Sequence, residues 1–279
     1  NTIGPKGAEG LHSVLESNRY IRILDLSGNN IGATEAEIIA NGLKKNYGIE
    51  VLNLSSNRNM QTSGIDAILK NLEKHPTLKI LYLVATNLGD DEAENIAIFL
   101  EKNTKITSLN ISSNKIQPRG GQLIATAFGK NQQLESFDIS SNPIGNASAI
   151  LFAESLKAHP RIEEFSIQNA NIGTEGLFAL TQTLKTHKTL ADFKVDLVPS
   201  DDDKKTNDTQ EALLNALEQN FPLTRFEFRC KKISEEFKNK VDAFMKRNLK
   251  LSQKEKTSEF IYIVVLLIRS KFLPDEATI

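Results

Sequence analysis

Apolar and polar residues alternate in a short line that returns several times along the chain. The line reads, in order, ILDLSGNNIG from Ile23, VLNLSSNRNM from Val51, SLNISSNKIQ from Ser108 and SFDISSNPIG from Ser136. Because side chains on a strand point alternately to its two faces, this pattern predicts a short β-strand with one buried face. The pairs expected in the core are Leu24 with Leu26, Leu52 with Leu54, Leu81 with Leu83, and Leu109 with Ile111.

A helical pattern follows each of these lines. Its apolar residues lie four apart, at Ile39 and Leu43, Ile68 and Leu72, Ile96 and Leu100, Ile124 and Phe128, Phe152 and Leu156, and Leu180 and Leu184. Residues four apart share one face of an α-helix, so this half of each unit predicts a helix with one buried face. A helix that carries the chain back makes the next strand parallel to the last.

Together the two patterns form a repeat of nearly constant length. Its first apolar position falls at Ile21, Ile49, Leu78, Ile106, Leu134, Ile162, Leu190 and Leu223. The spacings are 28, 29, 28, 28, 28, 28 and 33 residues. Such self-similarity is typical of a solenoid, in which each unit buries its apolar edge only against its neighbours. We therefore expect a single α/β solenoid with about eight parallel strands.

One polar position closes each helical pattern. It holds Asn18, Asn46, His75, Asn103, Asn131, His159, His187, Asn220 and Asn248. Asn and His tolerate the left-handed backbone conformation that often terminates helices, so this position predicts where each helix ends. It also implies one helix before the first strand and one after the last. The opening letters NTIG match NNIG at residues 29–32, so we expect a repeat array that is truncated at its N-terminus.

Over residues 1–250 the pattern L-x-x-L-x-L-x-x-N-x-I resembles that of leucine-rich repeats. The 28-residue unit with a full helix is similar to the ribonuclease-inhibitor subclass. The resemblance implies a horseshoe or arc, with a concave parallel β-sheet and α-helices outside. It also implies a ladder of asparagines that satisfies backbone groups where the chain leaves each strand, at Asn29, Asn57, Asn114 and Asn142. The repeat should be less regular where this ladder is interrupted, at Thr86, Ala170, Val198 and Lys231.

Residues 251–279 form a second segment, which we expect to cap the open end of the core. Lys254 and Lys256 replace the core pair of the next repeat, so the series of strands should stop here. The apolar run at residues 260–268 favours a capping helix over residues 252–273, with a membrane-bound or partner-binding segment as the alternative. The run is too short for a membrane span, because the hydrocarbon core is about 30 Å thick.

Composition and charge narrow the choice of partner. The chain has 279 residues, and its formal net charge of -1 provides no general attraction to nucleic acid or to an anionic membrane. Cys230 is the only cysteine in the sequence, so no internal disulfide can form, and the reducing cytoplasm is the expected compartment. A specific protein is therefore the expected partner.

Three features could carry chemistry, and each has a simpler explanation. His159 and His187 are one repeat apart and could share a metal, but both occupy the helix-ending position and lack a third ligand. The acidic stretch PSDDDKKTNDT at residues 199–209 lacks the ligand spacing of a calcium loop and predicts a solvated surface loop. PRGG and IGTEG, at residues 118–121 and 172–176, lack the Lys and Ser/Thr of a phosphate-binding loop. Because no nucleophile, base and orienting group can be assembled, we expect no enzyme, cofactor or metal.

Residues between the core leucines should face the concave side, where a solenoid offers a continuous surface. The first three repeats present an apolar set there, Ile23, Val51, Ile80, Tyr82 and Val84. The middle repeats present small polar residues, mainly serine. The last repeats present charged residues, among them Glu164, Asp192, Lys194, Arg225 and Arg229. We expect these ten residues to bind the partner, with Tyr82 as the main anchor because a rigid Tyr offers contact area at low entropic cost.

The sequence therefore predicts a non-catalytic protein-interaction module, the recognition part of a larger protein, that binds its partner on the concave face. Two alternatives stay open. Some proteins with this type of repeat are GTPase activators, which act by positioning the partner's own catalytic machinery. The Lys-, Ile- and Asn-rich composition without Trp also resembles effectors that intracellular bacteria deliver into the host cytoplasm.

Overall fold

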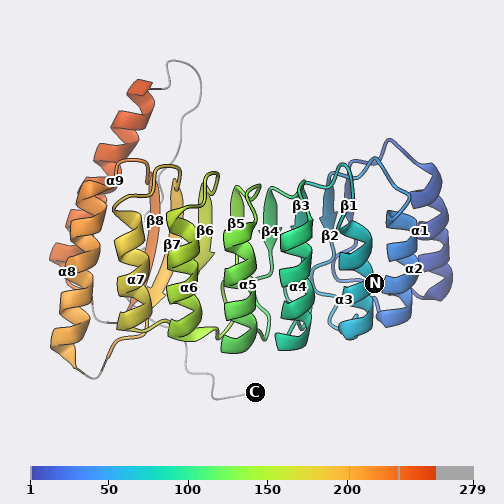
Figure 1. Cartoon of the computed structure of the whole chain (residues 1–279), viewed down its shortest axis with the longest axis horizontal. Coiled ribbons are helices and arrows are strands. Elements are labelled where there is room, and N and C mark those ends of the chain that lie inside the picture. The colour runs from blue at the N-terminus through green and yellow to red at the C-terminus, as the bar shows by residue number, and fades with distance from the viewer. Residues whose placement is uncertain (1, 201, 232, 256–279) are drawn as a thin grey trace.

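The computed structural model describes residues 2–200, 202–231 and 233–255. Within these ranges helices and strands alternate along the chain (Figure 1). The strands are β1 (Ile23–Asp25), β2 (Val51–Asn53), β3 (Ile80–Tyr82), β4 (Ser108–Asn110), β5 (Ser136–Asp138), β6 (Glu164–Ile167), β7 (Asp192–Leu197) and β8 (Arg225–Cys230). The helices are α1 (Pro5–Ser17), α2 (Ala33–Leu43), α3 (Gln61–Leu72), α4 (Asp90–Lys102), α5 (Pro118–Lys130), α6 (Gly145–Lys157), α7 (Thr174–Leu184), α8 (Asp203–Gln219) and α9 (Glu235–Glu255).

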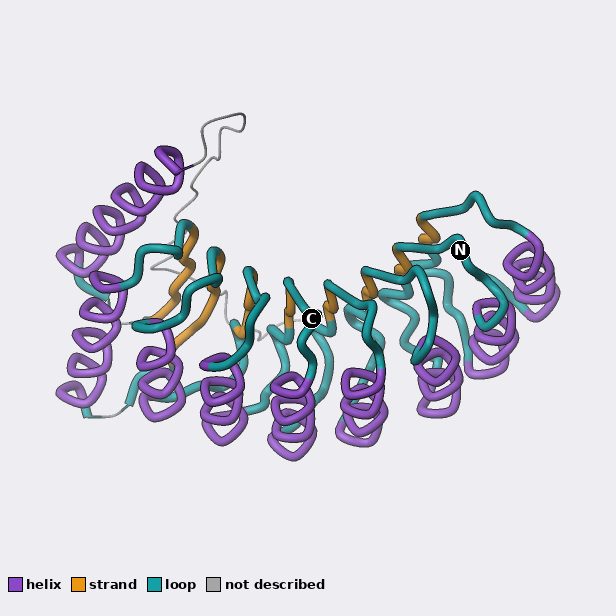
Figure 2. Tube along the Cα trace, turned by 45° about the horizontal axis from the view of Figure 1, so that its top comes forward, coloured by secondary structure: helices purple, strands orange, loops and turns teal. Residues whose placement is uncertain are grey.

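The strands pair in chain order, β1 to β8, in one parallel sheet. Figure 2 shows this sheet along the inner curve of an arc, with the helices on its outer side. Register places the core residues of successive repeats side by side, so that Leu24 pairs with Leu52 and Leu52 with Leu81. The predicted α/β solenoid, with a concave parallel sheet and outer helices, is confirmed.

The core between sheet and helices changes from aliphatic to aromatic along the arc. The file that begins with leucines continues as Phe137, Phe165, Phe193 and Phe226, one residue per strand. Successive rings in this file have centroids 6.2, 6.1 and 6.0 Å apart, and none of the four residues is more than 1% exposed. Aromatic pairs at such separations attract one another beyond the effect of area burial, which holds the repeats of this half together.

Buried asparagines hold the chain where it leaves the strands. The Nδ2 of Asn114 donates to the carbonyl oxygens of Leu83 and Ile111, at 2.9 Å each, and so joins two repeats. Its Oδ1 accepts two backbone N–H groups of the previous repeat, at 2.9 and 3.1 Å. Asn57 and Asn142 bond to their preceding repeats in the same way. The asparagine ladder expected from the sequence is confirmed at these three positions.

The repeats stay in register where the ladder residue is missing. Thr86 keeps one bond, because its Oγ1 donates to the carbonyl oxygen of Leu83 at 2.8 Å. In the later repeats the strands lengthen instead, from three residues in β1 to β5 to four in β6 and six in β7 and β8. The β7–β8 register extends as far as Leu197 and Cys230. Main-chain pairing thus replaces the asparagine bonds, and the predicted irregularity takes the form of longer strands.

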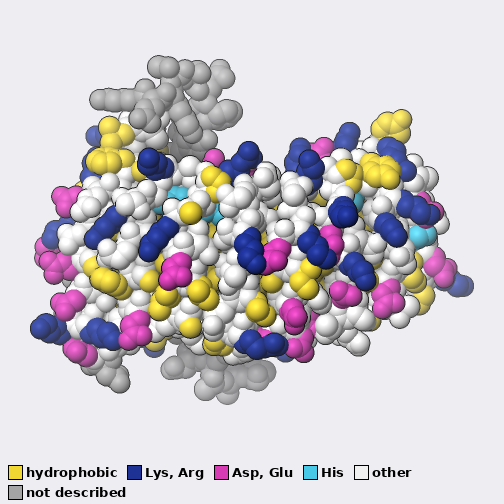
Figure 3. All heavy atoms as spheres, viewed as in Figure 1, with side chains coloured by type: hydrophobic (Ala, Val, Ile, Leu, Met, Phe, Trp, Pro, Cys, Tyr) yellow, Lys and Arg dark blue, Asp and Glu magenta, His cyan; other side chains and the backbone are white. Residues whose placement is uncertain are grey.

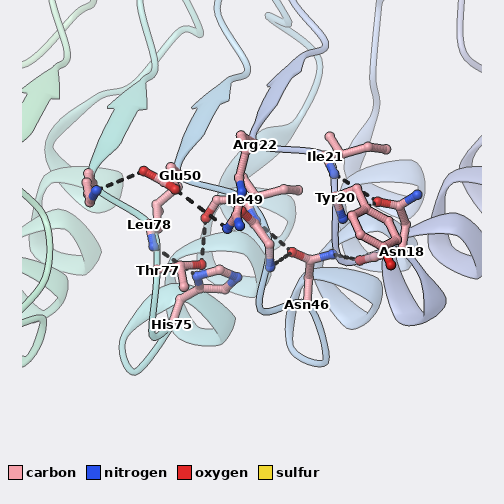
Figure 4. Close-up of polar contacts among 12 residues, drawn as sticks. Asn18, Tyr20, Ile21, Arg22, Asn46, Ile49, Glu50, His75, Thr77 and Leu78 are labelled. Carbon is pink, nitrogen blue, oxygen red and sulfur yellow. Dashed lines mark hydrogen bonds and ion pairs between the residues drawn. The ribbon is translucent and has the colours of Figure 1, made fainter.

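A second ladder lies at the other end of the repeats, where the helices stop (Figure 4). The Nδ2 of Asn46 donates to the carbonyl oxygens of Leu15 and Asn18 in the preceding repeat, at 2.8 and 3.0 Å. Its Oδ1 accepts the N–H groups of Gly48 and Ile49, at 2.8 and 2.9 Å. This single side chain therefore caps the turn into the next strand and ties that turn to its neighbour.

The helix-ending position is right, but the left-handed conformation predicted for it is wrong. Asn18 and Asn103 end α1 and α4 with φ of -80° and -79° and an extended ψ. The left-handed residues lie instead at the strand exits, as at Ser56, Ser113 and Ser141, with φ of 59°, 58° and 56°. Side-chain hydrogen bonds, and not the backbone angles of Asn, thus determine where these helices end.

The last helix passes through the position predicted to end it. Asn248 donates to the carbonyl oxygens of Asn220 and Leu223, at 2.9 and 2.8 Å, yet α9 continues to Glu255. The expected boundary between residues 250 and 251 therefore falls inside α9. Residues 256–279, which hold the apolar run and most of the expected capping helix, lie outside the described residues, so that capping role stays a prediction.

The acidic stretch at residues 199–209 is mostly helical, which corrects the predicted surface loop. Asp202 caps α8, because its Oδ1 accepts the N–H groups of Lys204 and Lys205 at 2.9 and 3.4 Å. A carboxylate is favourable there, since the free N–H groups at a helix N-terminus attract negative charge.

Among the helices of the described ranges, none has the length and apolarity needed to cross a membrane.

Candidate binding surface

The concave surface consists of rows of side chains that stand between the buried core positions. The middle row runs Asp25, Asn53, Tyr82, Asn110, Asp138, Ser166, Lys194 and Glu227. The row before it runs Ile23, Val51, Ile80, Ser108, Ser136, Glu164, Asp192 and Arg225. These two rows contain all but two of the ten residues predicted to bind a partner. The other two, Val84 and Arg229, lie one row further along the strands.

The apolar members of this set lie together on three neighbouring strands. Ile23 pairs with Val51 and Val51 with Ile80 in the sheet register, so that these residues form a continuous line. Ile23 is 69% exposed, while Tyr82 and Val84 are half-buried beside the line. We call these five residues the apolar patch. It is an exposed hydrophobic surface that a binding partner could cover.

The middle of the concave face is hollowed. A depression of about 290 Å³, here called the central groove, extends from Tyr82 on β3 to Asp192 and Lys194 on β7. Between these ends its lining is formed by small or short polar side chains, including Ser108, Asn110, Ser136, Asp138 and Ser166. The sequence shows these residues as a polar stretch, but the depth of the groove follows from the larger side chains that flank it.

Asp192 differs from its neighbours because it is buried. The residue is 6% exposed, and its Oδ2 accepts a hydrogen bond from Arg225 Nη1 at 2.9 Å and lies 3.5 Å from Lys194 Nζ. Burial raises the pKa of Asp192, while the positive charges of Lys194 and Arg225 act to lower it. Its Oδ1 is buried without a hydrogen-bond partner among the described residues. This end of the groove is therefore lined by a carboxylate that has one buried, unsatisfied oxygen.

A second carboxylate, which is half-buried, lies two rows further along β7. The Oδ2 of Asp196 accepts the N–H of Asn169 at 2.8 Å. Burial raises the pKa of Asp196, against the lowering effects of that hydrogen bond and of Arg229. Arg229 itself donates to the carboxylate of Glu227. The structure thus gathers the charged residues predicted for the last repeats, and several of them pair with one another.

The two histidines considered as metal ligands belong to the helix-ending ladder. His159 and His187 each use Nδ1 to accept a backbone N–H, from Ile162 at 3.2 Å and from Leu190 at 3.1 Å. Burial lowers the pKa of both, to about 4 for His159, so that both rings are neutral at pH 7. Over the described ranges no three His, Cys, Asp or Glu side chains are grouped so that they could hold a metal ion.

Comparison with known families supports the repeat assignment. A family model described as "Leucine Rich repeat" matches three segments of the chain, residues 17–34, 102–125 and 130–153. Each segment contains one of the short strands, β1, β4 or β5, and the turns that flank it. A comparison with curated proteins finds no match.

Two solved structures align with much of the chain. A structure of leiomodin-1 actin-binding site 2 aligns with a TM-score of 0.50 and 16% identity, over 59% of this chain and 92% of that one. The leucine-rich repeat-containing protein LegL7 from Legionella pneumophila aligns with a TM-score of 0.43 and 17% identity, over 88% of this chain and 87% of that one. At 16% identity the likeness to the leiomodin-1 structure concerns the fold alone.

Proposed function

Because the chain is a leucine-rich repeat protein, we propose that it is a non-catalytic module that binds a protein partner on its concave face. The observation that carries this proposal is the position of the apolar patch beside the central groove on one open side of the sheet. An apolar patch and a groove with polar groups are the two parts that protein interfaces combine. The rigid sheet holds both in place before a partner arrives, which lowers the entropic cost of binding.

The opposite side of the arc has a different character. Figure 3 shows the side covered by helices, where acidic and basic side chains are interspersed. Several of them pair between neighbouring helices and turns, as Lys102 does with Glu73 at 3.0 Å and Lys130 with Glu101 at 2.7 Å. Exposed pairs of this kind contribute little energy and keep a surface hydrated. Hydrophobic side chains also appear on this side, but the large exposed ones on α4, α5 and α7 lie singly, as Ile98, Leu123 and Phe178. The apolar patch instead forms a line across adjacent strands, which supports the concave face as the binding side.

Affinity capture with the intact chain tests the proposal. The double variant Tyr82→Ala/Ile80→Ser removes side chains from the apolar patch, whereas Tyr20→Ala removes an equally large side chain that is 88% exposed in the turn before β1. We expect the double variant to lose at least tenfold in affinity for a captured protein and the control to keep it. Equal capture by all three folded proteins would refute binding on this face.

GTPase regulation and action inside a host cell concern the identity of the partner and not the face that binds it. Nucleotide hydrolysis by a panel of small GTPases, with and without the chain, tests the first of these alternatives. An increase that Tyr82→Ala abolishes would assign the concave face to a GTPase.

A further inference from the structure

The central groove has an unequal distribution of charge. Its lining contains three carboxylates, those of Asp138, Glu164 and Asp192. The one cation among the lining residues is Lys194. Glu135 and Glu163 lie directly before β5 and β6 and are exposed at the same edge of the sheet. Counting Arg225, which donates to Asp192, this region has five carboxylates against two cations, so the middle of the concave face is acidic although the chain as a whole has a net charge of -1.

The carboxylates in the groove keep acceptor capacity after their internal hydrogen bonds are counted. Glu164 accepts from Ser136 Oγ at 3.0 Å, and Asp138 accepts from Asn110 Nδ2 at 3.3 Å and Ser140 N at 2.9 Å. A carboxylate offers about four lone-pair sites, so each of these residues can accept further donors. The groove thus offers several acceptors to a group that carries several donors.

Asp192 is more deeply buried than these two carboxylates. It is more than nine-tenths buried, and its Oδ1 faces no donor among the described residues, although Oδ2 has Arg225 and Lys194. Asp192 is one of the residues that line the groove, so its carboxylate adds negative charge at the end near β7. Its Oδ1 has almost no exposed surface, so a ligand reaches this oxygen only if the side chain turns toward the groove.

Resting on the function proposed above, we propose that the central groove receives an arginine side chain of the partner, with its guanidinium among Asp138, Glu164 and Asp192. The planar guanidinium carries five donors and loses less on desolvation than a lysine ammonium, which suits several carboxylates around one depression. The serines of the lining leave room for the arginine stem to enter. A bare metal ion fits less well, since the described residues contain no group of ligands placed to hold one.

The apolar patch sets the register of the bound segment. Tyr82 lies on β3 and Glu164 on β6, three strand spacings apart, which corresponds to about 14 Å at ~4.8 Å per spacing. An extended segment that crosses the strands advances ~3.4 Å per residue, so it covers this distance in about four residues. The partner segment should therefore carry an apolar side chain about four residues from its arginine.

Selection of short random peptides on the intact chain tests this inference without knowledge of the partner. We expect the selected peptides to combine an apolar residue and an arginine about four positions apart. The strongest peptide is then resynthesised with citrulline, which keeps the shape of arginine and removes its charge. Fluorescence anisotropy should show that the citrulline peptide binds the intact chain at least tenfold more weakly than the arginine peptide. Binding of the arginine peptide should weaken as salt is raised, and binding of the citrulline peptide should depend less on salt.

Isosteric variants of the groove provide the matched test on the protein. Glu164→Gln and Asp138→Asn keep the shape and one acceptor oxygen of each side chain, replace the other oxygen by an NH2 donor and remove the charge. Tyr20→Ala is the control. Each carboxylate variant should weaken binding of the arginine peptide at least threefold and should not change binding of the citrulline peptide. Thermal unfolding of each variant verifies that it is folded.

The outcomes separate this inference from the proposed function. If peptides bind, and Tyr82→Ala weakens them but citrulline does not, the concave face binds a partner and the arginine assignment is wrong. If Tyr82→Ala and the groove variants leave binding of every selected peptide unchanged, or if no peptide is selected, both the proposed function and the arginine assignment are overturned.

Discussion

Replacement of Asn114 by alanine tests whether single ladder side chains hold successive repeats together. Asn114 is 8% exposed, and its amide is bonded to the carbonyl oxygens of Leu83 and Ile111 and to two backbone N–H groups. Alanine leaves the N–H groups of Thr86 and Leu88 without a partner, whereas the two carbonyl oxygens each keep one bond, from Thr86 Oγ1 and Asn142 Nδ2. At about 1 to 3 kcal/mol for each buried unsatisfied group, the variant should lose about 2 to 5 kcal/mol of its free energy of unfolding.

Threonine at the same position provides a graded control. Thr86 occupies the equivalent position one repeat earlier, and its Oγ1 donates to the Leu83 carbonyl oxygen at 2.8 Å and, more weakly, to Asn114 Oδ1 at 3.5 Å. Asn114→Thr should therefore be destabilised about half as much as Asn114→Ala. Urea unfolding followed by circular dichroism gives both values. A loss below about 1 kcal/mol for Asn114→Ala would show that water or backbone adjustment replaces the ladder, and the reasoning would be refuted.

Three further predictions concern pH, helix packing and surface charge. Burial lowers the pKa of His159 from 6.5 to about 4, so the folded state favours the neutral ring. The contribution of His159 to the free energy of unfolding should be constant above pH 7. It should fall by about 2 to 3 kcal/mol as the pH drops from 6.5 towards 4, because only the unfolded chain is protonated in that range. Urea unfolding at pH 7 and pH 4.5 measures this loss of stability. His159→Asn, which inserts the residue that other repeats have at this position, should reduce the loss. If the variant loses as much stability as the original protein, His159 is not the source of the loss. Gly121→Ala should lower the free energy of unfolding by about 1 to 3 kcal/mol, because a Cβ at Gly121 would lie 2.5 Å from Ser148 Oγ and 2.7 Å from Ile144 Cβ. An unchanged melting temperature would contradict this prediction and would mean that α6 can shift away from α5. Lys130→Gln removes an exposed pair with Glu101 and should change the free energy of unfolding by less than about 0.5 kcal/mol; a loss above about 1 kcal/mol would contradict the view that the helix side is only a hydrated surface.

The sequence predicts the repeat architecture well because each repeat is a local pattern. The alternation around Leu52 and the four-residue spacing of Ile68 and Leu72 define a strand and a helix, and the constant period stacks them. The same period identifies the ladder residue Asn114 from its position alone. The position of the helix ends was also predictable, although its physical basis, a side-chain cap and not a left-handed turn, appears only in the hydrogen bonds of residues such as Asn46.

Features that depend on contacts between repeats could not be predicted from the pattern. The central groove exists because serines on β4 to β6 lie between Tyr82 and the charged residues of β7, which requires the sizes of side chains on five strands. Burial of Asp192 depends on two cations. Arg225 approaches it from β8, and Lys194 lies two residues after it on β7. The continuation of α9 past Asn248 could not be predicted from the helix-ending position, because Asn248 bonds to the preceding turn as the other ladder residues do.

Site-specific photocrosslinking tests most directly the claim that the concave face binds the partner. A photoreactive phenylalanine analogue is placed in the central groove at Ser108 of the intact chain, and in a second protein at Thr126, which is exposed on α5 on the helix side. The account predicts that a protein captured by the intact chain is crosslinked from position 108 and not from position 126. Crosslinking from position 126 alone, with none from the groove, would contradict it.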